Sequence, residues 1–166
     1  LAIATYSGAA GIMALDSLQG SDLVVPELSA YSAGKLQAMA PSWLHVGNPV
    51  DFWPIMMGQP DRGTAMRDIL NTLLSDDELD GVIVQQLAFT PLHGEALRMR
   101  LSNQANEHPY KPMIAGIPGP ASAECIANIQ SDGKLVAYPS PERATRAFKH
   151  LWQYSKLRNG IAMSGI

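Results

Sequence analysis

The residues near the start of the chain that could take part in chemistry are small ones between an apolar run and a helical pattern. The apolar run is Leu1 to Tyr6, and the helical pattern begins near Ala10. A small-residue segment in this position directs free backbone N–H groups and the positive end of a helix dipole toward one point. Such a point suits a phosphate, a phosphorylated side chain or a carboxylate. The predicted phosphate-binding residues are Ser7, Gly8, Ala9, Ala10 and Gly11.

A second polar group lies in the sequence Gly47-Asn48-Pro49-Val50-Asp51. Asn48 precedes a proline and is therefore expected to be extended, and the Asp51 side chain can accept hydrogen bonds from nearby backbone N–H groups. We expect both residues to support the structure around the site. Asp51 could in addition order the small-residue segment.

No residue is predicted to act as a catalytic group or as a metal ligand. The histidines are scattered, and none lies in a small-residue setting suited to a phosphorylated histidine: His45, His93, His108 and His150. No group of His, Cys, Asp or Glu has metal-ligand spacing. Trp43, Trp53, Met56 and Met57 are either core residues or a patch for another domain.

Apolar runs and helical patterns alternate along the chain. Strands are predicted at residues 1–6, 23–25, 81–84, 113–116 and 135–137. Helices are predicted at residues 10–19, 32–39, 61–74, 93–106, 120–131 and 141–154. The stretch from Pro41 to Pro60 is irregular and punctuated by prolines, and its length favours a functional role.

This alternation predicts an α/β fold, a three-layer, flavodoxin-like, doubly wound parallel sheet of about five strands in the order 2-1-3-4-5. In that order the loops after the first and third strands meet at the switch point where ligands bind. The fold therefore places residues 7–11 beside Gln85 to Thr90.

Composition excludes several classes of protein. The chain has 166 residues, a formal net charge of −3 and scattered basic residues, which argues against a nucleic-acid surface. No apolar stretch approaches the roughly 20 residues of a membrane span. The single cysteine, Cys125, excludes an internal disulfide and fits a cytoplasmic location. The chain begins inside a strand without a methionine, so we expect an excised domain.

Three segments together resemble a known family. They are SGAAGIMALD after the first strand, the later NPVD, and Tyr138 to Ala144 leading into an alanine-rich helix. In this order they resemble the second flavodoxin-like CoA-ligase domain of NDP-forming acyl-CoA synthetases, the superfamily of succinyl-CoA synthetase and ADP-forming acetyl-CoA synthetase. The resemblance covers residues 1–154 and predicts that residues 155–166 begin a linker to a missing domain.

The resemblance implies a parent protein that is an acid–thiol ligase and uses CoA, ATP or ADP, and Mg. Its other parts would be a CoA-binding domain, a ligase domain bearing a phosphohistidine, and an ATP-grasp module. This domain would contribute a helix N-terminus that stabilises the phosphoryl group, would bind no cofactor alone and would not turn over in isolation. We expect no nucleic-acid or membrane partner.

Other functions remain open at this point. Loops of this family are usually richer in glycine, whereas Ala9 and Ala10 stand here. This difference is compatible with a non-catalytic, synthetase-like regulatory region of a protein lysine acetyltransferase. A flavodoxin-like module that binds a nucleotide or flavin is a second alternative, and a scaffolding domain is a third.

Overall fold

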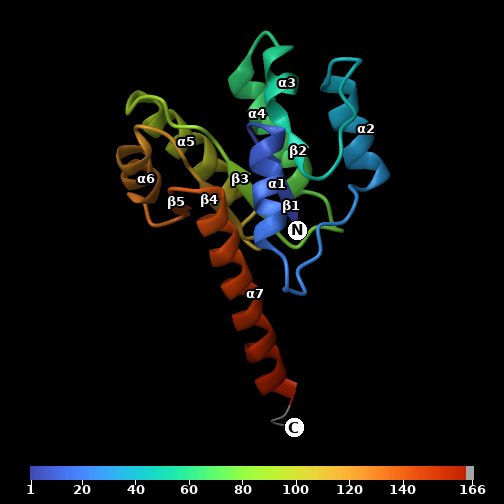
Figure 1. The fold of residues 1–166 in the computed structure, drawn as a ribbon, viewed down its shortest axis with the longest axis vertical. Coiled ribbons are helices and arrows are strands. Elements are labelled where there is room, and N and C mark those ends of the chain that lie inside the picture. The colour runs from blue at the N-terminus through green and yellow to red at the C-terminus, as the bar shows by residue number, and fades with distance from the viewer. Residues whose placement is uncertain (164–166) are drawn as a thin grey trace.

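The computed structural model describes residues 1–163 and contains a five-stranded parallel sheet in the order β2-β1-β3-β4-β5 (Figure 1). The strands are β1 (Ala2–Thr5), β2 (Val50–Asp51), β3 (Val82–Gln85), β4 (Met113–Gly116) and β5 (Val136–Tyr138). The register aligns Ile3 with Ile83, and Ile83 with Ile114. The predicted fold class and strand order are therefore confirmed.

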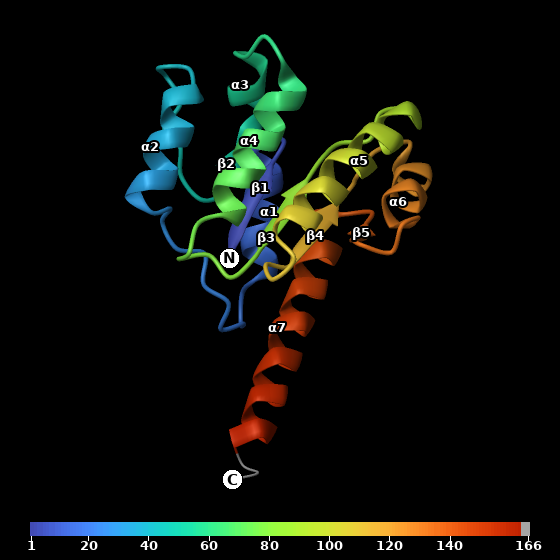
Figure 2. The ribbon, with the colours of Figure 1, turned by 180° about the vertical axis from the view of Figure 1, so that it is seen from behind.

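Seven helices accompany the strands in this part of the chain. They are α1 (Gly8–Ser17), α2 (Ala30–Met39), α3 (Phe52–Met57), α4 (Arg62–Leu74), α5 (Leu92–Glu107), α6 (Ser122–Gln130) and α7 (Pro141–Met163). Helices α1 and α7 pack side by side on one face of the sheet, and α4 and α5 cover the opposite face (Figure 2). Helices α2 and α3 pack on α4, and α6 packs on α5.

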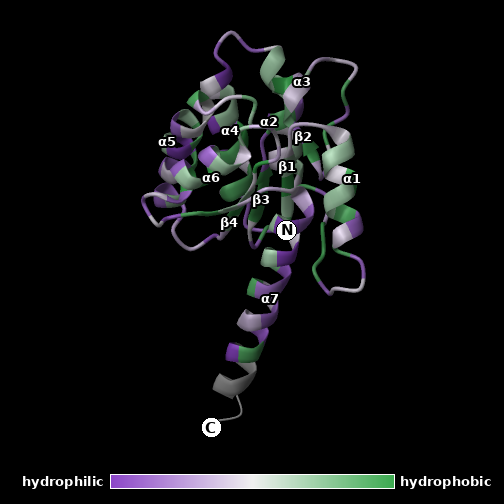
Figure 3. Ribbon diagram, turned by 60° about the vertical axis from the view of Figure 1, so that its left-hand side comes forward, coloured by the Kyte–Doolittle hydropathy of each residue, from purple (hydrophilic) through white to green (hydrophobic). Residues whose placement is uncertain are grey.

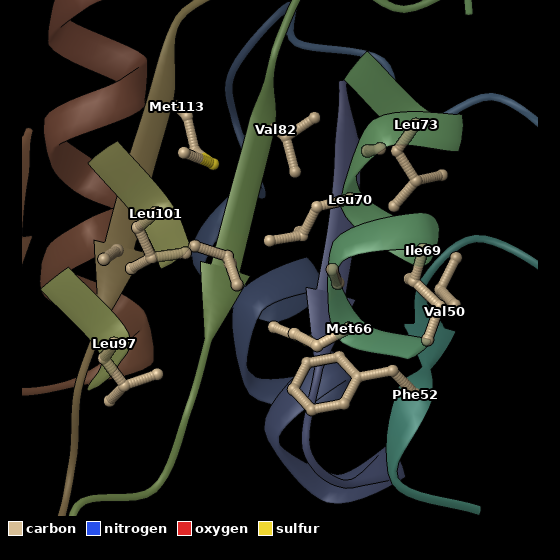
Figure 4. Packing of buried hydrophobic residues seen from close by; sticks show 14 of the residues in the cluster. Val50, Phe52, Met66, Ile69, Leu70, Leu73, Val82, Leu97, Leu101 and Met113 are labelled. Atoms are coloured by element: carbon tan, nitrogen blue, oxygen red, sulfur yellow. The ribbon is translucent and has the colours of Figure 1, made fainter. Parts of the chain in front are cut away.

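Both faces of the central strands are buried, which explains why these strands are apolar without alternation. The larger core lies between the sheet and α4 and α5, where Phe52, Met66 and Leu70 are buried (Figure 4). The smaller core lies under α1 and α7 and contains Ile3 and Ile83. The two layers hold the carboxyl ends of β1 and β3 in fixed positions.

The second strand is not where the sequence pattern predicts it. Residues 23–25 form no strand: Leu23 and Val25 are partly buried against the smaller core, whereas Val24 is 68% exposed. The strand is instead Val50–Asp51, where Val50 is fully buried. The stretch from Pro41 to Pro60 is thus only partly irregular, because it contains β2 and α3.

The last helix is longer than predicted. It continues beyond Tyr154 to Met163 and projects away from the rest of the molecule (Figure 1). The coloured part of α7 that projects mixes polar and apolar residues (Figure 3). Trp152 Nε1 donates to Asp22 Oδ1 at 3.0 Å, and Lys156 pairs with the same carboxylate, which holds this helix against the segment after α1. The domain boundary at residue 154 stays a prediction, and residues 164–166 lie outside the described residues.

The far edge of the sheet is β5, which follows α6 directly. The Gln130 side-chain oxygen accepts a hydrogen bond from the Ala137 N–H at 3.0 Å. This bond joins the end of α6 to the middle of the edge strand. No helix within residues 1–163 is long and apolar enough to cross a membrane.

Candidate functional site

The N-terminus of α1 presents two free backbone N–H groups at the carboxyl end of β1. Ser7 is extended, with φ −161° and ψ 148°, and its hydroxyl accepts from the Ala10 N–H at 3.2 Å. The Ser7 carbonyl accepts from the Gly11 N–H at 3.1 Å. Among the described residues, nothing accepts from the N–H groups of Gly8 and Ala9, and both residues are exposed. These two groups can therefore donate to an external anion.

The five predicted residues consequently fall into three groups. The helix begins at Gly8, earlier than the sequence pattern predicts, so residues 8–11 form its first turn rather than a loop. Ala10 and Gly11 are buried, and their N–H groups are already used within this turn. Ser7 acts as the cap, which leaves Gly8 and Ala9 as the available donors.

Gly11 has a packing role. A Cβ atom at this position would lie 3.0 Å from Pro49 Cβ and 3.3 Å from Thr5 Cγ2. A side chain there would push α1 away from the strand layer. Gly11 therefore brings the start of α1 close to β1 and to the segment before β2.

Asp51 lies beside the first residue of α1. Its Oδ1 atom accepts from the Trp53 N–H at 3.2 Å and so caps α3. Its Oδ2 atom lies 3.8 Å from the position that a Cβ of Gly8 would occupy. The carboxylate stabilises the positive end of α1, and it also repels a second anion at the same place.

Asn48 binds three backbone groups and has a structural role. Its Oδ1 atom accepts from the Ile3 N–H at 3.0 Å, and its Nδ2 atom donates to the carbonyls of Leu1 at 3.0 Å and Pro26 at 2.9 Å. The side chain thus takes the place of a strand partner along the first part of β1. Asn48 does not reach the free N–H groups of α1, since it binds the opposite end of the strand.

The loop after β3 comes to the same edge of the sheet, as the topology predicts. Gln85, at the end of β3, is fully buried, and its side-chain atoms have no hydrogen-bond partner among the described residues. The following residues line a cavity of about 440 Å³ between α3, α4 and α5. Its lining residues include Tyr6, Trp53, Arg62, Phe89, Leu97 and Arg100.

The two arginines in this cavity carry no signal in the sequence pattern. Arg62 begins α4, and Arg100 lies in the middle of α5, so only the packing of these helices brings them together. Trp53 and Met56 line the same cavity, Met56 is buried, and Trp43 and Met57 are exposed. The four residues of the predicted apolar group therefore do not form one patch.

The histidines and the cysteine do not form a reactive group in the described part of the chain. His108 Nε2 lies 2.9 Å from Asn71 Oδ1, and His150 Nδ1 lies 3.3 Å from Gln153 Oε1, whereas the side chain of His93 lies outside the described residues. Burial raises the pKa of Cys125. Among the side chains that the structure describes, no group of three or more His, Cys, Asp or Glu could hold a metal ion.

Comparison with known proteins identifies relatives of one kind, although no family model matches the chain. The chain is 27% identical over 158 residues to the alpha subunit of the ADP-forming acetate–CoA ligase I of Pyrococcus furiosus, a match that covers 93% of the chain and 32% of that subunit. It is 28% identical over 83 residues to the ADP-forming acetate–CoA ligase II of Archaeoglobus fulgidus, which covers 50% of the chain and 12% of that protein.

Solved structures share the fold. The dinucleotide-forming acetyl-coenzyme A synthetase 1 of Candidatus Korarchaeum cryptofilum superposes with a TM-score of 0.79 in its apo form, at 22% identity over 99% of this chain and 35% of that chain. The same protein in complex with phosphate and ADP gives a TM-score of 0.80 at 21% identity.

The chain therefore spans about a third of the length of the P. furiosus subunit and of the Korarchaeum protein. The fold class and the strand order agree with the resemblance noted in the sequence. The chain is thus similar in sequence to part of two ADP-forming acetate–CoA ligases and shares the fold of the solved structures, which is consistent with a domain of an NDP-forming acyl-CoA synthetase.

Proposed function

We propose that this chain is a domain of an NDP-forming acyl-CoA synthetase whose α1 N-terminus stabilises the phosphoryl group of a phosphohistidine carried elsewhere in the parent protein. The observation that carries the proposal is the pair of exposed, unpartnered N–H groups of Gly8 and Ala9. They lie at the carboxyl end of β1, next to β3, where the strand order reverses.

The physical basis is electrostatic. The two donors are fixed at the start of a ten-residue helix whose dipole also favours negative charge there. Because the strand and the Ser7 cap hold these donors in place, they need little reorganisation when a phosphoryl group arrives. Phosphoryl transfer depends mainly on positioning and on neutralising the charge of the transferred group, which is what such donors supply.

The remaining chemistry belongs to other parts of the parent protein in this proposal. These are a CoA-binding domain, a ligase domain with the phosphohistidine, and an ATP-grasp module that uses ATP or ADP with Mg. The names of the relatives support the use of CoA and ADP, and one structural neighbour was solved with phosphate and ADP. The isolated domain is expected to bind the phosphoryl group without turnover.

The substitution Gly8→Pro tests the donors directly, because proline at the first helical position removes one N–H and is compatible with the helix. Ser7 is already extended, as a residue before proline must be. The variant should bind inorganic phosphate about tenfold more weakly, since a hydrogen bond to a charged group contributes about 1.5–3 kcal/mol. The measurement is a ¹⁵N NMR titration, followed at the amides of Ala9 and of the neighbouring residues.

The matched control is Ala30→Pro at the first position of α2, which also follows a capping serine, Ser29, with φ −54° and ψ 151°. This variant should keep the affinity of the wild-type chain. If phosphate shifts no amide near Gly8 and Ala9, or if both variants bind like the wild type, α1 does not hold the phosphoryl group. A regulatory or scaffolding domain then becomes the better interpretation.

A further inference from the structure

The cavity between α3, α4 and α5 has the features of a second binding site. It lies on the face of the sheet that is opposite to α1, because Met56 and Leu97 in its wall belong to the larger core. Its volume of about 440 Å³ falls in the range of small-molecule pockets, roughly 300–1,000 Å³. The wall is mostly apolar, and its charged groups are the two arginines.

Neither arginine is neutralised by an ion pair. Within the described chain, no carboxylate lies within 4.0 Å of the guanidinium groups of Arg62 or Arg100. Asp61 is a carboxylate that interacts with Arg100 by charge: hydrogen bonds from Thr64 and Gly63 lower the pKa of Asp61, and the positive charge of Arg100 lowers it further. The Asp61 Oδ1 atom accepts from the N–H groups of Gly63 and Thr64 at 2.8 and 3.2 Å, and its Oδ2 atom accepts from Thr64 Oγ1 at 2.7 Å.

The local charge balance is therefore positive. Two guanidinium groups and the N-terminus of the thirteen-residue helix α4 stand against the single charge of Asp61, while the neighbouring hollow that Arg100 also lines adds the opposite charges of Glu107 and Arg67. Gly63 lets the Arg100 guanidinium lie close to the first turn of α4, because a Cβ at position 63 would lie 3.4 Å from Arg100 Nη2. Arg100 is half-buried, so its charge is less screened by water than that of the exposed Arg62.

The rest of the wall suits a flat apolar group. Tyr6, Trp53 and Phe89 contribute aromatic rings, and the Trp53 and Phe89 side chains are 43% and 59% exposed. A ligand that covers exposed aromatic side chains around a pocket is stabilised, because it removes their apolar surface from water. A guanidinium group adds a planar pair of donors that matches a carboxylate.

We propose that this cavity binds an organic anion in which a carboxylate is joined to a ring-sized apolar body. The carboxylate is held by Arg100 with support from Arg62, and the apolar body lies among Trp53, Phe89 and Leu97. The site goes beyond the proposed phosphoryl-binding function. It does not depend on Gly8 or Ala9, since it is formed on the other face of the sheet.

The test is a titration of the 166-residue chain with 3-phenylpropionate, followed by NMR at the amides of Gly63 and Phe89 and at the Trp53 indole. Saturable binding is expected. The neutral isostere 3-phenylpropionamide and the short acid propionate should each bind at least about tenfold more weakly, because each lacks one of the two recognised parts.

The variants Arg100→Met and Arg62→Met separate the two cations. Arg100→Met should weaken binding of 3-phenylpropionate about tenfold, and Arg62→Met should weaken it less, because its guanidinium is exposed. The matched control is Arg158→Met, an exposed arginine in the projecting part of α7. It should bind like the wild type.

Three results would overturn the proposal: no saturable binding, equal binding of the acid and its amide, or an equal loss in all three arginine variants. Gly8→Pro separates the two sites. It should leave binding of 3-phenylpropionate unchanged while it weakens binding of phosphate. Failure of the phosphate titration alone therefore leaves the cavity proposal standing.

Discussion

Replacing Asp51 by asparagine should strengthen phosphate binding at the N-terminus of α1. The Asp51 Oδ2 atom lies 3.8 Å from the position of a Gly8 Cβ, so the carboxylate is close to any anion that the Gly8 N–H binds. Asparagine is as good an N-cap residue as aspartate, and its side-chain oxygen can still accept from Trp53 N–H. The substitution therefore removes a charge and keeps the cap of α3.

The size of the effect follows from this geometry. With a hydrogen bond of about 2.9 Å between the N–H and a phosphate oxygen, the phosphorus lies on the order of 6 Å from the carboxylate. Two unit charges at about 6 Å in water repel each other by about 0.7 kcal/mol. For a phosphate with a charge of about −1.5, this repulsion therefore weakens the binding free energy by about 1 kcal/mol at low ionic strength. Asp51→Asn should then bind phosphate about fivefold more tightly.

The assay is the NMR titration with inorganic phosphate, carried out for the wild type and Asp51→Asn at low and at high salt. The gain should shrink as salt is added, because the repulsion is screened. Asp16→Asn, also on α1 but far from its N-terminus, is the matched control and should change the affinity little. An unchanged or weaker affinity of Asp51→Asn would refute the placement of the phosphate beside Gly8.

Two further predictions concern stability. Gly11→Ala should lower the free energy of unfolding, measured in urea, by about 1–2 kcal/mol, because the new Cβ would lie 3.0 Å from Pro49 Cβ. The control Gly34→Ala, in open space on α2, should raise it by about 0.5–1 kcal/mol. Equal effects would contradict the packing role of Gly11. Burial raises the pKa of Asp76, but hydrogen bonds such as that from Ser29 Oγ at 2.7 Å outweigh it and hold this pKa below its ordinary value. The ionised Asp76 therefore stabilises the fold fully above its ordinary pKa, and this stabilisation is lost as the pH falls through the lowered pKa. Asp76→Asn should make the free energy of unfolding depend less steeply on pH in the acid range, and an unchanged slope would contradict this.

The fold could be predicted because β1, β3 and β4 are largely apolar runs buried on both faces, and β5 is a short apolar run at the edge of the sheet. The second strand could not, because β2 has only two residues and shares its role with the Asn48 side chain. Residue propensities do not reveal that a side-chain amide supplies some of the hydrogen bonds that a neighbouring strand would make. The run at residues 23–25 has the composition of a strand, but it only rests against the smaller core through Leu23 and Val25 and leaves Val24 exposed.

The residue types predict the position of the candidate site, but they do not predict which N–H groups are its donors. The small residues and the Ser7 cap mark the N-terminus of a helix, whereas the assignment of each N–H depends on where the first turn begins. The cavity was missed for another reason. Arg62 and Arg100 belong to different helices, and no local pattern in the sequence relates them.

The side-chain amides at the two margins of the sheet have a consequence for association. Exposed edge strands offer unpaired N–H and carbonyl groups to which the strand of another chain can add. Asn48 occupies such groups of β1 beyond the short β2, and Gln130 occupies the N–H of Ala137 in β5. Both edges of the sheet are thereby protected against pairing with a strand of another chain. The shortness of their strands, two and three residues, has the same effect.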